Sequence, residues 1–162
     1  MPRLRHLVRS LLALPLLAAV SAPAAAPKPS EPIRAALEKR DPDAAVAAAD
    51  AALKSSPKDT DVLLWAGRAY GQRALSASVF TKMSWAKRCR EAWEKAVGID
   101  PAFLEARNEL LRYYLMAPGI AGGGVEKARE QAARIAAADA TQGHVARGRI
   151  AEHEKDLAGA EA

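Results

Sequence analysis

The stretch DVLLWAGRAYGQRAL, residues 61–75, predicts an amphipathic helix. Leu63, Ala66, Gly67 and Tyr70 recur at the spacing that places side chains on one face of a helix. The stretch AFLEARNELLRYYLM, residues 102–116, repeats this arrangement with Arg107, Leu110, Leu111 and Tyr114. Because the same kind of helix recurs along the chain, the sequence indicates a structural repeat.

A second kind of helix alternates with the first and carries an apolar stripe made mostly of small residues. Three phrases of this kind end at Pro57, Pro101 and Ala140. Their positions i, i+4 and i+7 are Ala45, Ala49 and Ala52, then Cys89, Trp93 and Ala96, and then Ala128, Ala132 and Ile135. We predict an all-α fold with helices at 31–39, 42–54, 60–75, 85–98, 102–116, 124–138 and 142–154.

Aspartate, threonine and proline predict where several of these helices begin. Asp41-Pro42 and Asp100-Pro101 each offer an N-cap acceptor followed by proline at the first helical position. Asp59 or Thr60 can cap the third helix, and Thr141 can cap the last.

The pattern Ala66-Gly67-x-x-Tyr70, followed by Cys89-x-x-x-Trp93, Ala96 and Pro101, resembles the tetratricopeptide repeat (TPR), W-x-x-L-G-x-x-Y…A-x-x-x-F…P. Leu63, Ala66 and Cys89 stand where the TPR pattern has Trp, Leu and Ala, and each exchanges one core residue for another. The interval from Pro57 to Pro101 exceeds the usual period of about 34 residues by roughly ten, and the next interval by about five. The resemblance implies a TPR-like helical-hairpin solenoid of about three units, two of them with insertions.

The insertions resemble those of an exported bacterial subgroup of TPR proteins with a P-G-I-x-G-G-G loop. The resemblance covers roughly residues 56–150, and that subgroup is named for its repeats rather than for an activity. It therefore implies protein binding as the function, with a protein or peptide partner.

The first insertion, LSASVFTKMSW at residues 75–85, contains Val79, Phe80, Met83 and Trp85. One interpretation is a hydrophobic lid or a partner-binding patch. The other is a packed bulge that covers the helix at 31–39. We favour the bulge, because large exposed apolar patches are uncommon on soluble monomers.

The second insertion, APGIAGGGVEKA at residues 117–128, also has two interpretations. The first interpretation is an anion or small-molecule site, with or without enzymatic activity, made by Gly122, Gly123, Gly124 and Lys127. Backbone N–H groups at the start of a helix suit anions. However, the P-loop pattern and the strand that precedes it are both missing.

The alternative interpretation of this loop is a turn between two packed helices. Pro118 stops the preceding helix, Gly119 can take the left-handed cap conformation, and Ile120 can fold back onto the core. We predict the turn and keep anion binding as the alternative.

The N-terminal residues 1–24 predict a cleaved signal peptide. Arg3, Arg5 and Arg9 precede an apolar run at 11–20, which is too short to span a bilayer, and Ala22-Pro23-Ala24 fits the small-x-small cleavage rule. We expect a periplasmic or secreted bacterial protein without a stable membrane anchor after cleavage. Residues 25–30 then form a flexible mature N-terminus, and 31–162 the TPR-like helical domain.

Charge and composition argue against several other functions. The chain has 24 Lys and Arg against 19 Asp and Glu, and three of the cations lie in the predicted signal, so no concentrated basic face indicates a nucleic-acid partner. The single cysteine, Cys89, forms no internal disulfide and is expected to be buried. His144 and His153 lie too far apart to share one helical face, so we expect no metal site or cofactor. No serine lies in a G-x-S-x-G context, and we expect no catalytic site and no enzyme.

The TPR resemblance implies that the first helix of each unit lines a concave groove. Leu64, Arg68 and Gln72 would face the groove from one unit, and Glu105, Asn108 and Arg112 from the next. Glu109 lies three residues before Arg112, so the two can pair along the helix. Leu64 and Glu105 depart from the pattern of TPR proteins that clamp a C-terminal carboxylate, so we do not transfer that clamp to this chain.

Overall fold

The computed structural model describes residues 27–160, with side chains described as far as residue 155. Within this range the elements of secondary structure are all helices and there is no strand, so the predicted all-α, helical-hairpin solenoid is confirmed. The elements are α1 (Glu31–Glu38), α2 (Pro42–Ser55), α3 (Thr60–Ser76), α4 (Val79–Ile99), α5 (Leu104–Met116), the short 3-10 helix η1 (Gly119–Ala121), α6 (Val125–Ala138) and α7 (Ala140–Ala160). The predicted signal peptide, 1–24, lies outside the described residues. None of the described helices is long and apolar enough to cross a membrane.

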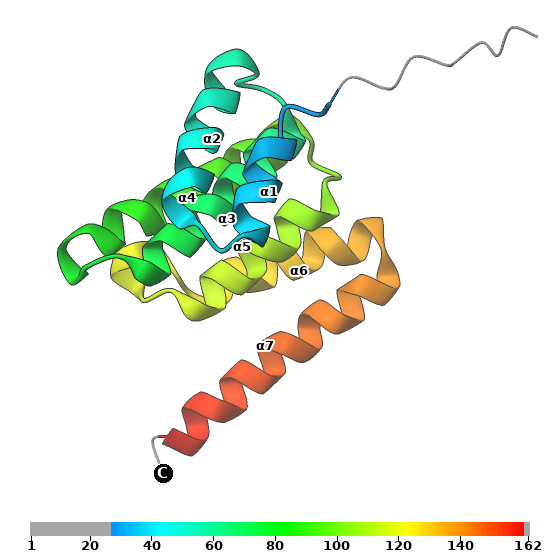
Figure 1. The fold of residues 1–162 in the computed structure, drawn as a ribbon. Coiled ribbons are helices and arrows are strands. Elements are labelled where there is room, and N and C mark those ends of the chain that lie inside the picture. Colours follow the sequence, from blue (N-terminus) through cyan, green and yellow to red (C-terminus); the bar gives the residue numbers. More distant parts are fainter. Residues whose placement is uncertain (1–26, 161–162) are drawn as a thin grey trace, which may run out of the picture.

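Each helix packs against the next one along the chain, so that successive hairpins stack into a solenoid (Figure 1). The hairpins are α1–α2, α3–α4 and α5–α6. Helix α7 packs on α6, and its far end extends away from the other helices (Figure 1).

The stretch at 61–75, which lies in α3, packs closely against α4, a helix of the second kind. The Trp93 indole on α4 lies directly over Gly67 on α3, and a Cβ built at Gly67 would come within 2.2 Å of Trp93 Nε1. The indole N–H donates to the Leu64 carbonyl at 3.0 Å, and Trp93 is buried. Glycine is therefore required at position 67, because any side chain would displace the indole.

The alanine stripes pack as the spacing predicts. Ala45 and Ala49 on α2, Ala96 on α4, and Ala128 on α6 are fully buried. Small side chains allow helix axes to approach closely, which explains why a chain so poor in aromatic residues can still form a core.

The helix starts agree only in part with the predictions. Asp41 accepts from the Ala44 N–H at 2.9 Å, and Asp59 accepts from Asp61 and Val62, as expected of N-caps.

Two predicted starts were wrong. Asp100 accepts from the Ala102 N–H inside a turn, and α5 begins only at Leu104. Helix α7 begins at Ala140 rather than at 142, because Asp139 and not Thr141 accepts from the Gln142 N–H at 3.0 Å.

The first insertion does not form a packed bulge, so that prediction was wrong. It lengthens two helices instead: α3 continues to Ser76, and α4 begins at Val79 rather than at 85. Val79 and Phe80 are 82% and 96% exposed. A longer pair of antiparallel helices satisfies the backbone groups of the inserted residues without a loop.

A polar network just after the lengthened part of α4 holds this helix against α2 and α3. The Tyr70 hydroxyl donates to Asp50 at 2.5 Å, and Arg88 donates to the same carboxylate and to the Tyr70 oxygen. The Arg88 guanidinium also lies over the rings of Tyr70 and Trp85, which stack on each other 6.1 Å apart. Three helices thus meet around one arginine.

The two ends of the described chain are tied to the solenoid. Ser30, the last residue of the segment expected to be flexible, is buried, and its hydroxyl donates to Asp61. At the other end, Arg129 on α6 pairs with Glu154 on α7, while Ala146 of α7 is fully buried.

Candidate functional site

A groove crosses helices α3, α5 and α7. Helices α3 and α5 each begin a hairpin, and α7 follows the last hairpin. Its polar half encloses about 290 Å³ and is lined by Arg68, Glu105, Asn108, Glu109, Arg112, Gln142, Val145 and Arg149. Four of the six residues expected in a partner groove therefore come together: Arg68, Glu105, Asn108 and Arg112.

The other two expected residues do not line this pocket. Leu64 is only 4% exposed, because it lies on the face of α3 that packs into the core beside Trp93. Gln72 is exposed on α3 but does not reach the pocket. Leu64, Arg68 and Gln72 all lie on α3 as predicted, but of the three only Arg68 reaches α5.

A ladder of stacked and paired side chains leads from α1 to the groove. Arg34 on α1 and Arg68 on α3 lie over the Trp65 ring, 4.8 and 4.5 Å from its centroid. Arg68 Nε then donates to Glu109 on α5 at 2.8 Å, and Arg112 lies 3.6 Å from the other Glu109 oxygen. The ladder therefore joins α1, α3 and α5 across the surface of the solenoid.

The predicted pairing of Glu109 with Arg112 is confirmed, but the cross-helix partner Arg68 was missed. Spacing along one helix can predict an i, i+3 pair. Nothing in a single sequence indicates which turn of α3 will face which turn of α5.

A second link joins α5 to α7. Asn108 Nδ2 donates to the Gln142 side chain at 3.0 Å, and Gln142 Nε2 donates in turn to Asp139 at 3.1 Å. Hydrogen bonds to Gln142 lower the pKa of Asp139, chiefly the one from the Gln142 backbone N–H. Because Asp139 also caps α7, one carboxylate fixes both the start of that helix and the side chain that lines the groove.

The charge in the polar half of the groove is not fully neutralised. Arg68, Arg112 and Arg149 face Glu105 and Glu109, and Glu109 alone makes ion pairs with two of the arginines. A guanidinium carries five donors, so Arg68 and Arg112 keep free donors after pairing with Glu109. This half of the groove can therefore bind a carboxylate or another acceptor.

The apolar half of the groove adjoins the polar half and shares Glu109 and Arg112 with it. It encloses about 380 Å³, and its remaining lining residues are Gly71, Ala74, Leu75, Lys82, Met83, Ala86, Cys89, Trp93, Tyr113, Met116, Ala117, Pro118 and Ala121. These residues come from α3, α4, α5 and the loop after α5. Sequence reasoning missed this pocket, because it depends on the lengthened helix α4.

The glycine loop is a closed turn whose donors are already used. The N–H groups of Gly122, Gly123 and Gly124 donate to the carbonyls of Gly119, Pro118 and Tyr114. The Lys127 ammonium donates to the Gly122 carbonyl at 3.0 Å and lies over the Tyr114 ring. The four residues considered for an anion site therefore bond within the loop and its flanking helices.

Two details of the predicted turn were wrong. Gly122, with a φ of 85°, takes the left-handed conformation that was expected at Gly119, which instead opens η1. Ile120 does not fold onto the core but is 88% exposed.

The loop is held by α4 and α5. The Ala121 carbonyl accepts from the Tyr113 hydroxyl at 2.8 Å, and a Cβ at Gly122 would meet the Arg90 guanidinium.

Reactive side chains in the described part of the chain are buried or scattered. Burial raises the pKa of the Cys89 thiol to about 12, so the thiol is protonated at neutral pH. Among the described residues, no three His, Cys, Asp or Glu side chains lie close enough to hold a metal ion.

A comparison with models of known protein families finds no match to this chain, and a search of curated proteins finds no significant match.

Proposed function

We propose that the chain is an exported, TPR-like interaction module that docks a peptide or a partner helix in the groove across α3, α5 and α7. The observation that carries the proposal is the pairing of an arginine-lined polar pocket with an apolar pocket through Glu109 and Arg112. Such a surface suits a segment with an apolar side chain beside an acceptor group.

The ladder supports this proposal because it holds the groove in shape before a partner arrives. Arg68 is fixed between Trp65 and Glu109, so little side-chain freedom is left to lose on binding. Arginine and tryptophan are also the residues that contribute most often to binding energy at protein interfaces.

The predicted signal peptide places the module outside the cytoplasm, in the periplasm or the medium. We do not extend the proposal to an anion site at Gly122–Gly124 and Lys127, because the three glycine N–H groups already bond to backbone carbonyls and the Lys127 ammonium donates to the Gly122 carbonyl. The proposed module has no catalytic role of its own.

Site-specific photo-crosslinking in the producing bacterium tests the proposal. Crosslinking residues at Glu105 and Arg112 would lie in the groove, and a control at Lys155 on α7 lies outside both pockets. We expect one discrete partner trapped from the groove positions only. Equal trapping from all three positions, or none from the groove, would exclude groove docking.

A further inference from the structure

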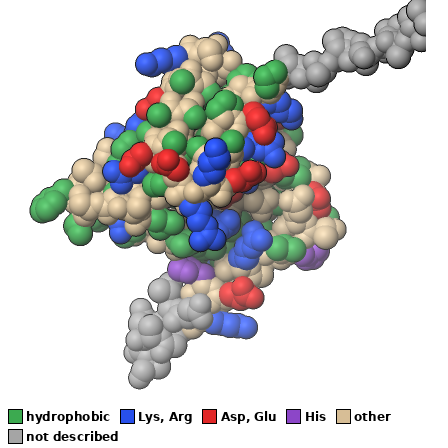
Figure 2. All heavy atoms as spheres, in the orientation of Figure 1, with side chains coloured by type: hydrophobic (Ala, Val, Ile, Leu, Met, Phe, Trp, Pro, Cys, Tyr) green, Lys and Arg blue, Asp and Glu red, His purple; other side chains and the backbone are tan. Residues whose placement is uncertain are grey.

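Large apolar side chains gather at one end of the solenoid. Of seven large apolar residues found exposed in the described range, five lie at the α3–α4 turn and on the α5–α6 loop. We call them the apolar tip: Leu75, Val79, Phe80, Met116 and Ile120, which are 80, 82, 96, 77 and 88% exposed. Figure 2 shows hydrophobic side chains protruding at the end where Figure 1 places the α3–α4 turn beside the α5–α6 loop.

The two segments of the apolar tip are adjacent and held in place. Leu75 and Met116 line the same apolar pocket, although they belong to different hairpins. Arg90 on α4 reaches the Ala121 carbonyl of the α5–α6 loop, next to Ile120.

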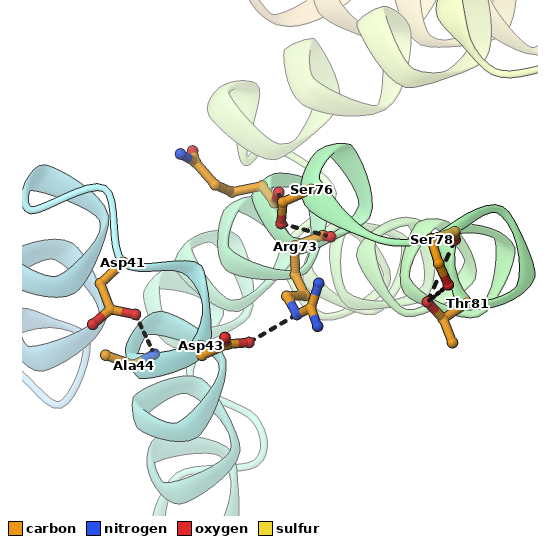
Figure 3. Close-up of polar contacts among 8 residues, drawn as sticks. Asp41, Asp43, Ala44, Arg73, Ser76, Ser78 and Thr81 are labelled. Carbon is orange, nitrogen blue, oxygen red and sulfur yellow. Dashed lines mark hydrogen bonds and ion pairs between the residues drawn. The ribbon is translucent and has the colours of Figure 1, made fainter.

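The α3–α4 turn is short and is tied by its own hydroxyl groups (Figure 3). The Ser76 hydroxyl donates to the Arg73 carbonyl at 3.2 Å, and the Ser78 and Thr81 hydroxyls lie 3.1 Å apart. On the side of α2, Arg73 pairs with Asp43 at 2.8 Å. The exposed side chains are therefore presented from a fixed backbone.

The two chain segments that carry the apolar tip contain basic residues and no acidic ones. Residues 62–90 and 110–125 contain no Asp or Glu. Lys82 and Arg112 line the pocket beside the tip, and the one carboxylate there, Glu109, is already paired with two arginines. Among the described side chains Lys82 makes no ion pair.

We propose that the apolar tip binds the interface of a membrane that carries anionic lipid. Apolar side chains on a fixed turn enter the boundary between headgroups and acyl chains, while Lys82 and Arg112 meet the lipid phosphates. The contact is reversible and peripheral, in contrast to an anchor that spans the bilayer.

Two other occupants fit the apolar tip less well. A second copy docked tip to tip would bring the basic residues of both chains together, and neither tip segment brings a carboxylate to compensate. A protein partner would need a surface shaped around side chains that project separately from two turns, whereas the lipid interface accepts projecting side chains of any shape.

The test is flotation of the exported protein with vesicles of phosphatidylglycerol and phosphatidylcholine, and with vesicles of phosphatidylcholine alone. We expect binding to the anionic vesicles that weakens as salt is added. Phe80→Ser and Ile120→Ser should each lower the partition coefficient about tenfold or more, since each removes a side chain that the lipid interface would bury. Lys82→Glu should lower binding to the anionic vesicles by about fivefold or more.

Ile99→Ser is the matched control, because Ile99 is an exposed apolar residue of α4 that lies outside the apolar tip. We expect it to bind vesicles like the unaltered chain. All variants share the same N-terminal residues, so a difference in vesicle binding between them arises from the substituted side chain. Circular dichroism confirms that each variant is folded.

The proposal is overturned if the anionic vesicles bind no protein, or if the Phe80 and Ile120 substitutions bind as well as the control. A dimer that Phe80→Ser abolishes, or a protein crosslinked at Phe80 without vesicle binding, would also overturn it and assign the tip to that partner. Phe80 and Ile120 line neither half of the groove. Failure here is therefore distinguishable from failure of groove docking.

Discussion

Replacing Gly67 by alanine tests the contact on which the packing of α3 against α4 depends. The new Cβ would lie 2.2 Å from Trp93 Nε1, so the indole has to move. Overpacking of this kind costs about 1–3 kcal/mol of unfolding free energy. Displacing the indole also breaks its hydrogen bond to the buried Leu64 carbonyl, for about 1–3 kcal/mol more.

Alanine itself stabilises a helix by up to about 1 kcal/mol relative to glycine, which offsets part of the loss. We therefore expect Gly67→Ala to lower the free energy of unfolding by about 3 kcal/mol. Urea denaturation followed by circular dichroism measures the change.

Gly148→Ala is the matched control for Gly67→Ala. Gly148 also lies within a helix, α7, but a Cβ there would meet nothing within 4 Å. We expect this variant to be as stable as the unaltered chain or slightly more stable. If Gly67→Ala unfolds at the same urea concentration as Gly148→Ala, the contact does not limit the packing, and the reasoning is refuted.

A double variant separates the steric clash from other effects. Trp93→Phe removes the ring nitrogen that a Cβ at position 67 would approach most closely. We expect the costs of Gly67→Ala and Trp93→Phe to be less than additive, with a coupling free energy of about 1 kcal/mol or more. Additive costs would mean that the two residues do not interact.

The groove, the buried thiol and the glycine loop each give one further prediction. Glu109→Gln should lower the free energy of unfolding by about 1–3 kcal/mol in urea denaturation, because it leaves Arg68 and Arg112 without their carboxylate, whereas Glu105→Gln should change it by less than about 0.5 kcal/mol. Burial raises the pKa of the Cys89 thiol from the ordinary value of 9.0 to about 12, so the contribution of the buried thiol to stability is complete below pH 9.0 and is lost as the pH rises toward 12. At mildly alkaline pH a thiol-specific disulfide reagent should label Cys89 only after unfolding. Rapid labelling of the folded chain would contradict the burial of Cys89. Gly123→Ala should lower the melting temperature, because its Cβ would lie 1.7 Å from the Ala117 carbonyl oxygen, and Gly119→Ala, with open space around the Cβ, should not.

Much of the fold could be predicted because its signals are local. Helical spacing of apolar residues predicted all seven α-helices, and Asp41 and Asp59 cap their helices as expected. The starts at 102 and 142 were misjudged because Asp100 bonds within a turn, and because Asp139 rather than Thr141 accepts from the Gln142 N–H.

The candidate site could be predicted only in part. The TPR resemblance implied that Arg68, Glu105, Asn108 and Arg112 face one groove, and the structure places these four in one pocket. The roles of Trp65 and Gln142 could not be predicted, because each depends on contacts with residues more than one helix away in sequence.

The local sequence determined the two kinds of helix and their alternation, because backbone hydrogen bonds and periodic apolar faces act over a few residues. It also supplied the glycine and the small residues that the helix contacts require. Which turns of neighbouring helices face one another was decided only by the packed tertiary structure. That register pairs Arg68 with Glu109, opens the apolar half of the groove beside it, and leaves Phe80 and Ile120 exposed instead of buried. Side-chain packing across helices sets the register, and it depends on residues far apart in the chain.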